Sequence, residues 1–231
     1  MQLKVGGITP FSATDYPGKL AAVIFVQGCP WRCGYCHNPY LQTRTEGSPV
    51  AWADVLALLR RRVGLIDAVV FSGGEPTMDP ALHDAIQEVR ALGFGIGLHT
   101  AGMYPRRLAE VLPWVDWVGM DIKATQQGYD AVTRVTDSAR APWTSAELVL
   151  ASGVAHEFRT TVHPALHTPP ELLALARTLR TMGVRNFVLQ VFRGVGCLDD
   201  SLNAATTAAY PDQAVIEQTA ALFERFTLRR E

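Results

Sequence analysis

Cysteine is scarce in this chain, which has four cysteines among 231 residues, and three of the four lie within eight consecutive residues. The fourth, Cys197, is far along the chain, so two separated cysteine pairs, the common pattern of structural zinc, are missing. The N-terminal residues also lack a basic start that leads into an apolar run, as an export signal would have. We therefore expect a cytoplasmic protein with reduced thiols and no disulfide.

Long apolar runs and an excess of one charge are missing as well. The longest relevant apolar run, residues 20–26, is far too short to cross a bilayer. Lys and Arg number 21 against 22 Asp and Glu, which gives no overall field to attract nucleic acid. The three arginines at 60–62 fit the solvated end of a helix. We expect no membrane and no nucleic-acid partner, and the 48% of hydrophobic residues indicates a folded core.

No linker or low-complexity segment divides the chain, so we expect a single domain over residues 1–231. Apolar runs typical of strands alternate with helical patterns, which predicts an α/β fold with a parallel sheet and right-handed crossovers. The runs lie at 21–26, 68–71, 95–98, 117–120, 158–162 and 187–191. This number of units predicts a partial, TIM-like (β/α)6 barrel with outer helices. An N-terminal extension (1–20) and a C-terminal segment with a helix (194–231) would flank the core at 21–193.

Helical spacing and capping residues predict the main helices. Apolar residues at helical spacing indicate one helix over 52–63. A second begins at Asp79-Pro80 and ends at Gly93, and a third begins at Thr168-Pro169 and ends at Gly183. A last helix is predicted to carry Ile216, Leu222, Phe223 and Phe226.

A loop directly after the first apolar run holds Cys29, Cys33 and Cys36 among Gly, Pro, Trp and Tyr residues. Thiolates are the usual ligands of iron–sulfur clusters, and a cubane held by three of them keeps one iron open to another ligand. Zinc completed by a local histidine such as His37 is one alternative. Buried hydrophobic cysteine is another, although the composition of the loop does not resemble a core.

Polar residues follow each of the other predicted strands. In parallel barrels the loops after the carboxyl ends of the strands meet at one rim, so we expect these residues to converge. The segments are 72–76, 99–102, 121–123, 159–164 and 190–193. Gly73 and Gly74 allow a close approach of backbone to ligand, and Lys123 offers a cation to a carboxylate. A surface position for Lys123, and rim salt bridges for Arg159 and Arg193, remain alternatives.

The cysteine spacing, the Gly73-Gly74-Glu75-Pro76 stretch and the Asp121-Ile122-Lys123 stretch together resemble the radical S-adenosylmethionine superfamily, and within it the glycyl-radical enzyme activating enzymes. Residues 11–29 and the Cys36-His-Asn-Pro39 stretch resemble, more narrowly, the activating proteins of anaerobic ribonucleoside-triphosphate reductase. The resemblance runs from about residue 6 to Arg193. Beyond Arg193 no distinctive motif is present.

The resemblance implies two cofactors, a [4Fe–4S] cluster held by the three loop cysteines and S-adenosylmethionine chelated to the open iron. It also implies a tyrosine beside the adenine and a Gly-Gly-Glu-Pro segment at the ammonium. The residues that we expect to bind the cofactor are Tyr35, Gly73, Gly74, Glu75, Thr100, Asp121, Lys123, Arg159 and Arg193.

The activity that the resemblance implies is reductive cleavage of S-adenosylmethionine and transfer of a glycine Cα hydrogen to the resulting 5′-deoxyadenosyl radical. The partners would be a glycyl-radical enzyme, anaerobic ribonucleotide reductase, and an electron donor such as flavodoxin or ferredoxin. Related activases often have Asp-Thr-Asn-Gly where this chain has His99-Thr-Ala-Gly102. Imidazole is a poor substitute for a hard oxygen ligand, so we expect the monovalent-cation site beside the cofactor to be missing or altered.

Three other functions stay open on the sequence. The chain can activate a different glycyl-radical enzyme, or it can be a radical enzyme for a small molecule, such as a deazapurine-forming synthase. A binding or electron-transfer module without catalysis is the third, and the polar loops at the other five strand ends argue against it. The four cysteines leave no room for the additional ferredoxin-like cluster domain of some activases.

Overall fold

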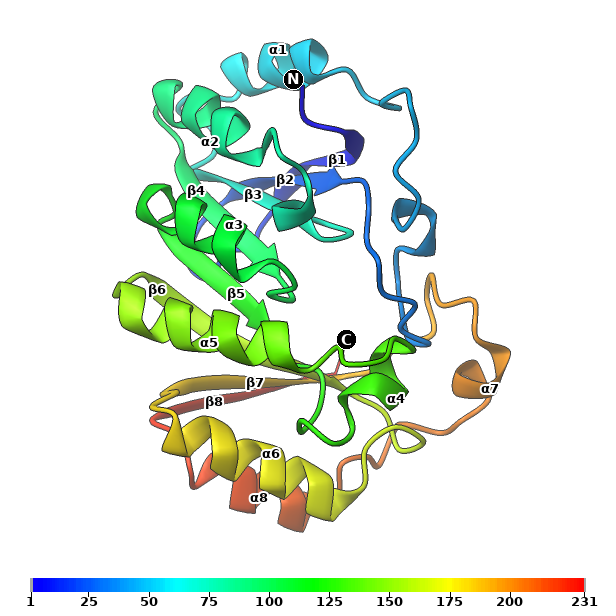
Figure 1. Cartoon of the computed structure of the whole chain (residues 1–231). Helices are drawn as coiled ribbons and strands as arrows, with labels where there is room; N and C mark the ends of the chain where they lie inside the picture. The colour runs from blue at the N-terminus through cyan, green and yellow to red at the C-terminus, as the bar shows by residue number, and fades with distance from the viewer. Residues whose placement is uncertain (1, 231) are drawn as a thin grey trace.

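The strands of the protein form one continuous eight-stranded sheet in chain order (Figure 1). The computed structural model describes residues 2–230, so the outer limits of the predicted domain, residues 1 and 231, lie outside the described residues. The strands are β1 (Val5–Ser12), β2 (Ala21–Val26), β3 (Ala68–Gly73), β4 (Gly95–Thr100), β5 (Trp117–Asp121), β6 (Ala155–Val162), β7 (Asn186–Val191) and β8 (Arg225–Arg229). Neighbouring strands from β2 to β8 are parallel, whereas β1 is antiparallel to β2.

The longer helices cover the outer side of the curved sheet, and short ones lie beside the strand ends (Figure 1). They are α1 (Trp52–Arg60), α2 (Leu82–Ala91), α3 (Pro105–Val111), α4 (Tyr129–Thr133), α5 (Arg140–Ser152), α6 (Pro169–Thr181), α7 (Asp200–Asn203) and α8 (Gln213–Ala220), with short 3-10 turns η1 (Pro39–Leu41), η2 (Pro76–Met78) and η3 (Leu112–Trp114). A capping box between Thr168 and Glu171 begins α6, as the sequence predicts. Within residues 2–230 no helix has both the length and the apolar character that crossing a bilayer requires.

The two faces of each strand pack against different surroundings. On β2, Ala22, Ile24 and Val26 belong to the large core beneath the helices, while Ala21 and Val23 join a small cluster on the other face. Tyr16 packs against this inner cluster, and its ring stacks on Trp117 with 5.1 Å between centroids. Apolar side chains therefore fill the amino-terminal part of the barrel, which leaves the carboxyl end for polar groups.

The α/β barrel class follows the sequence prediction, and all six predicted runs lie within β2 to β7. The structure adds a strand at each edge of the sheet. The predicted last helix is wrong beyond Ala220, because Leu222 and Phe223 lie in the connection that follows α8 and Phe226 lies in β8. The alternation of Phe226 and Leu228 with polar neighbours has the period of a strand. The helix predicted over 52–63 ends at Arg60.

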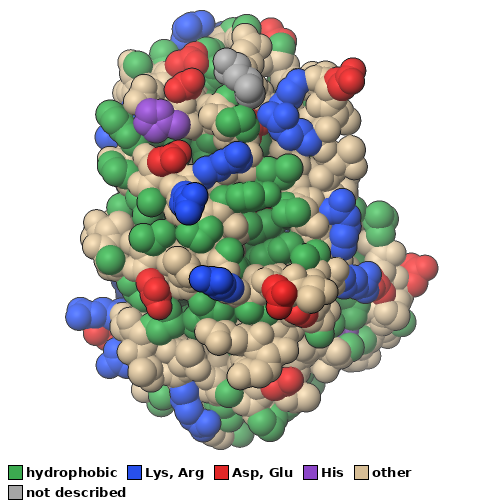
Figure 2. Space-filling model, viewed as in Figure 1, with side chains coloured by type: hydrophobic (Ala, Val, Ile, Leu, Met, Phe, Trp, Pro, Cys, Tyr) green, Lys and Arg blue, Asp and Glu red, His purple; other side chains and the backbone are tan. Residues whose placement is uncertain are grey.

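The edge strand β1 is irregular. Its register with β2 shifts twice, between Val5 and Gly7 and again between Thr9 and Ser12, and Pro10 lies in the second irregular stretch. Over the face seen in Figure 2, basic and acidic side chains are interspersed with hydrophobic ones, in keeping with the balanced composition.

Candidate active site

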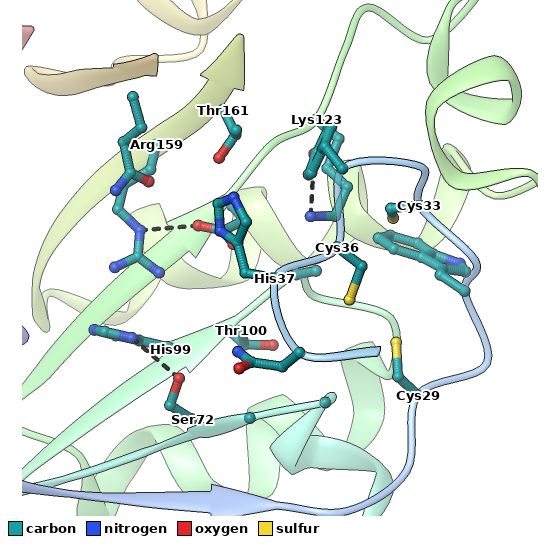
Figure 3. A pocket seen from close by; sticks show the side chains of 18 of the residues that line it. Cys29, Cys33, Cys36, His37, Ser72, His99, Thr100, Lys123, Arg159 and Thr161 are labelled. Atoms are coloured by element: carbon teal, nitrogen blue, oxygen red, sulfur yellow. Dashed lines mark hydrogen bonds and ion pairs between the residues drawn. The ribbon is translucent and has the colours of Figure 1, made fainter. Parts of the chain in front are cut away.

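A cavity of about 430 Å³ lies where the carboxyl ends of the strands meet the cysteine loop. The sequence-predicted residues that line it are Cys29, Cys33, Tyr35, Cys36, Gly73, Gly74, Thr100, Asp121, Lys123, Arg159 and Arg193. Figure 3 shows the three cysteines and Lys123 toward one side, and Arg159, His99 and Ser72 toward the other. Six segments that are distant in the sequence thus meet at one cavity, as the rim argument predicts.

The cysteine loop leaves β2 through Gly28, which has a φ of 101° that favours glycine. Backbone hydrogen bonds hold the loop: Gly28 N–H donates to Leu41 O at 2.7 Å and Cys36 N–H donates to Cys33 O at 3.1 Å. All three loop thiols are free and partly exposed toward the cavity. The loop is therefore organised by its own backbone, with its sulfur atoms available to a ligand.

The donor set fits an iron–sulfur cluster. Burial raises the pKa of Cys29 to about 12 and also raises the pKa of Cys33, so both thiols need a strong positive partner to ionise. Iron supplies such a partner, and thiolates are its usual ligands in clusters. Among residues 2–230 no three His, Cys, Asp or Glu side chains converge on a single ion. A cluster binds each thiolate through a different iron atom and does not require that convergence.

The Lys123 ammonium is held between aromatic rings beside the cysteine loop. Its Nζ donates to the Tyr35 hydroxyl at 3.3 Å and lies 5.9 Å from the ring centroid of Trp31. Burial by itself lowers its pKa, but the Tyr35 hydroxyl, the Cys33 thiol and the Asp121 carboxylate outweigh burial and hold the pKa well above the usual value. No carboxylate in residues 2–230 makes a salt bridge with it. A cation is therefore present at the cavity without an acidic partner.

Asp121 and Arg159 form an ion pair on the opposite side of the cavity. Arg159 Nε donates to Asp121 Oδ1 at 2.8 Å, and its terminal nitrogen donates to Gly119 O at 3.3 Å. Burial raises the pKa of Asp121, but Arg159 and Lys123 outweigh burial and bring the pKa below its usual value. Gly119 provides the space, because a Cβ there would lie 2.8 Å from the guanidinium carbon. The salt-bridge alternative for Arg159 is thus present in the structure, at the cavity wall.

Glu75 is the one predicted site residue that does not line the cavity. Its fully buried carboxylate accepts from the backbone and hydroxyl of Thr77 at 3.1 and 2.6 Å, from the Thr100 hydroxyl at 2.7 Å and from Ala101 N–H at 2.9 Å. The side chain therefore ties the loop after β3 to the loop after β4. A Cβ on Gly74 would lie 2.3 Å from Gly28 O, so only glycine allows this approach to the cysteine loop.

His99 is fixed by hydrogen bonds to both ring nitrogens. Nε2 lies 2.8 Å from Asp15 O and Nδ1 lies 3.3 Å from Ser72 Oγ. Because a carbonyl can only accept, Nε2 donates to Asp15 O, and in the neutral ring Nδ1 accepts from the serine hydroxyl. Burial, followed by the charge of Arg159, lowers the pKa of His99 well below its usual value. His99 thus connects the segment at residue 15 with β3 and β4.

Sequence reasoning missed four residues that line the cavity, namely Thr14, Asp15, Trp31 and Arg229. Ser72, Thr161 and Gln190 also line it, and they lie in the strand-end segments that were expected to converge, although no individual role was predicted for them. Asp15 lies in the segment that carries the resemblance, but nothing in that segment shows that it turns back to the barrel. Arg229 was not predicted, because the sequence analysis expected a helix where β8 lies. Its guanidinium pairs with Glu157 at 3.1 Å, and Glu157 is 4% exposed at its side chain.

Residues 192–203, called the strap here, pack against the cysteine loop. His37 Nε2 lies 2.8 Å from Arg193 O, and the buried Cys197 thiol donates to Gly34 O at 3.3 Å. Asp199 forms an ion pair with Arg134, whose guanidinium would lie 2.8 Å from a Cβ on Gly34. His37 and Cys197 differ from the three loop cysteines. The His37 imidazole is hydrogen-bonded through Nε2 to Arg193 O, and the Cys197 thiol is hydrogen-bonded to Gly34 O.

An open barrel of parallel strands with a three-cysteine loop at its carboxyl rim defines an enzyme built around a cysteine-held cluster. The chain belongs to the radical SAM superfamily, whose family model matches residues 23–179. The two cofactors of this family, a [4Fe–4S] cluster and S-adenosylmethionine, are those that the sequence predicts. The cavity provides thiols for the first, and a free cation with close backbone for the second.

Similar proteins include activating enzymes. A protein of Methanocaldococcus jannaschii described as a glycyl-radical enzyme activating enzyme is 28% identical over 213 residues, which cover 87% of this chain and 84% of that one. Pyruvate formate-lyase-activating enzyme of Clostridium pasteurianum is 32% identical over 136 residues, 56% of this chain and 57% of its own. The crystal structure of QueE from Escherichia coli shares the fold, with a TM-score of 0.60 and 19% identity over 100% of this chain and 95% of that one.

Proposed function

We propose that this protein activates a glycyl-radical enzyme, and that its target is anaerobic ribonucleoside-triphosphate reductase. The observation that carries the proposal is the meeting of the three-cysteine loop, a lone ammonium and close backbone at one cavity of an unclosed barrel. The likeness to activating enzymes over most of both chains supports the class. The motif at residues 11–29 and 36–39 supports the particular target.

In this proposal the chain's own residues bind and orient the cofactor. Lys123 would receive the cofactor carboxylate, because its ammonium makes no salt bridge among the described residues. The backbone at Gly73 and Gly74 would bind the amine of the cofactor, and Tyr35 would contact its base. The bound cluster and S-adenosylmethionine together supply the one-electron chemistry that makes a hydrogen-abstracting radical. The walls of the cavity would hold this radical close to its target and exclude water, which favours hydrogen transfer over side reactions.

The open edge of the barrel is the proposed entry for the glycine. Strands β1 and β8 are the two ends of the sheet and do not pair with each other. A polypeptide loop can enter such a gap, and strand-end backbone can hold an extended segment with little side-chain recognition. Most of the affinity would then come from the folded partner's surface.

The test is electron paramagnetic resonance on anaerobic reductase that has been incubated with the reduced protein and S-adenosylmethionine. We expect a stable, oxygen-sensitive glycyl doublet, a much weaker reaction with a short peptide cut from the reductase, and no doublet with Cys33→Ala protein. If reductase never acquires the doublet under conditions in which the protein cleaves S-adenosylmethionine, the proposed target is wrong.

A second candidate function, a radical enzyme for a small anionic molecule, is favoured by one observation. Arg159, Arg193 and Arg229 all line the cavity, a concentration of guanidinium groups that a carboxylate or phosphate would use. Two of the three are paired with Asp121 and Glu157, which weakens this reading. Formation of 5′-deoxyadenosine in equal amount with a modified small acid would support it.

A further inference from the structure

A second cavity of about 370 Å³ adjoins the first at the open edge of the barrel. The two cavities share Val191 and Arg193, which lie at and just after the end of β7. The far wall includes Arg230, directly after the edge strand β8. The second cavity therefore lies on the β8 side of the opening, next to the cavity that the cysteine loop lines.

The charge of the second cavity is positive. Two arginines line it, and none of its described lining residues is acidic. The Arg230 guanidinium donates to the backbone carbonyls of Ala208, Tyr210 and Pro211, so it braces the wall while keeping its charge. The exposed Arg193 side chain makes no salt bridge to any residue in 2–230. An exposed arginine that makes no salt bridge favours a carboxylate ligand.

The walls of the second cavity suit an extended polypeptide. Gly194, Ala205 and Ala208 contribute little side chain, so a ligand backbone can approach closely. The position of Arg193 is itself fixed, because its carbonyl lies 2.8 Å from His37 Nε2 and its neighbour Phe192 stacks on the His37 ring. The guanidinium therefore starts from an anchored backbone, which lowers the entropy cost of binding.

We propose that the second cavity binds a segment of the target polypeptide next to the reacting glycine, and that Arg193 recognises an acidic side chain on that segment. This inference rests on the proposed activase function and adds one side-chain contact to a segment that is otherwise held mainly through its backbone. The preference for an acidic side chain arises because Arg193 lies at the junction of the two cavities, where one ligand residue can reach it while its neighbour faces the cofactor.

The test uses the cluster-loaded protein with S-adenosylmethionine and short glycine-containing peptides, in which one glutamate is moved along the sequence and compared with glutamine at each position. At one position, we expect the peptide with glutamate to bind about tenfold more tightly than the peptide with glutamine. Arg193→Ala should remove this preference, and Arg193→Glu should transfer it to the peptide with lysine there. Arg177→Ala, on the exposed face of α6, is the matched control and should keep the wild-type preference.

A second variant separates recognition from folding. Ala208→Phe fills the second cavity and should weaken all peptides, with the affinity for S-adenosylmethionine unchanged. Equal binding of glutamate and glutamine peptides at every position would overturn the proposal. So would a loss of S-adenosylmethionine affinity in Arg193→Ala with the peptide preference intact, because Arg193 would then belong to the cofactor site. A glycyl doublet on reductase without any charge preference defeats only this inference, whereas absence of the doublet defeats the proposed function.

Discussion

The four cysteines differ in what surrounds their sulfur atoms. Cys29, Cys33 and Cys36 face the cavity, while the buried Cys197 thiol is occupied by Gly34 O and by the N–H of Asp199. Replacing any loop cysteine with alanine should abolish cluster assembly and cofactor cleavage together, because two thiolates cannot hold a cubane with a defined open iron. Cys197→Ala should keep the cluster. Iron and sulfide analysis with spectroscopy checks both, and iron loss in Cys197→Ala would contradict a three-ligand site.

Lys123 is the residue on which cofactor affinity should depend most. Lys123→Ala should raise the dissociation constant of S-adenosylmethionine while leaving the iron content unchanged, because in the proposed function its ammonium pairs with the cofactor carboxylate and is not a ligand of iron. Loss of one partner of a desolvated ion pair costs about 2–5 kcal/mol, or roughly 30- to several-thousand-fold in affinity. Equilibrium binding to the loaded protein measures the effect, with the exposed Lys19→Ala as control. An unchanged constant would show that Lys123 is only a structural lysine.

His99 should make stability depend on pH in a predictable direction. Its folded pKa lies well below the unfolded value of about 6.5, so the unfolded chain takes up a proton that the native ring does not. The stabilisation is complete above about pH 6.5 and falls by about 1.4 kcal/mol for each pH unit below it, until the folded pKa is reached. Denaturant unfolding across this range should show a shallower slope for His99→Gln than for the wild type.

His83→Gln, a change of a half-buried histidine on α2, provides the comparison for a histidine away from the cavity. Equal slopes for wild type and His99→Gln would mean that burial and the charge of Arg159 do not keep the ring neutral.

The strap and the cysteine loop form one structural element, joined at Gly34. The Arg134–Asp199 ion pair is largely exposed on the arginine side, so its own contribution is small, about 0–1 kcal/mol. Asp199 additionally caps α7 by accepting from the N–H groups of Ser201 and Leu202. Arg134→Ala should therefore speed loss of iron to a chelator by up to about fivefold, and Asp199→Ala by more, since it also loses the cap.

The bleaching rate of the cluster absorbance measures this effect, and identical rates in wild type and Asp199→Ala would show that the strap does not hold the loop. Melting of the cluster-free proteins identifies any general loss of stability, which would lower the melting temperature independently of the iron.

Periodicity predicted the interior strands and failed at the edges, for physical reasons. Strands β2, β3, β5 and β7 are mostly apolar and buried on both faces, which is a strong sequence signal. In β1, Gly6, Gly7 and Pro10 weaken the strand pattern. In β8, Phe226 continues the helical spacing of Phe223, so a strand and a helix compete for the same residues until the sheet provides a neighbour.

The cysteine loop was predictable because its chemistry is local, whereas the network of Glu75 was not. The Glu75 carboxylate accepts hydrogen bonds from the Thr100 hydroxyl and from Ala101 N–H, at the end of the next strand. These hydrogen bonds can form only after β3 and β4 have aligned. The second cavity is of the same kind, because Arg193 and Arg230 come together only when β8 joins the sheet.

At the scale of the whole molecule, the barrel is an arc with two free edges, and free strand edges invite pairing with another chain. The irregular register of β1, with Pro10 in its irregular stretch, gives a neighbouring chain little to pair with. On β8, the exposed Arg225 places positive charge along the edge. The opening can thus stay wide enough for a partner's loop and still resist unwanted strand addition.

Self-association is therefore the expected consequence of straightening β1. Gly7 has open space around its Cα, so Gly7→Val combined with Pro10→Val should fit the monomer while restoring a regular strand edge. Light scattering at rising protein concentration should show assemblies in this variant and none in the Ala53→Val control on α1. A variant that stays monomeric would show that a feature other than the irregular register of β1 prevents self-association. The irregular register of β1 would then prevent aggregation in a crowded solution, although the barrel keeps an open edge.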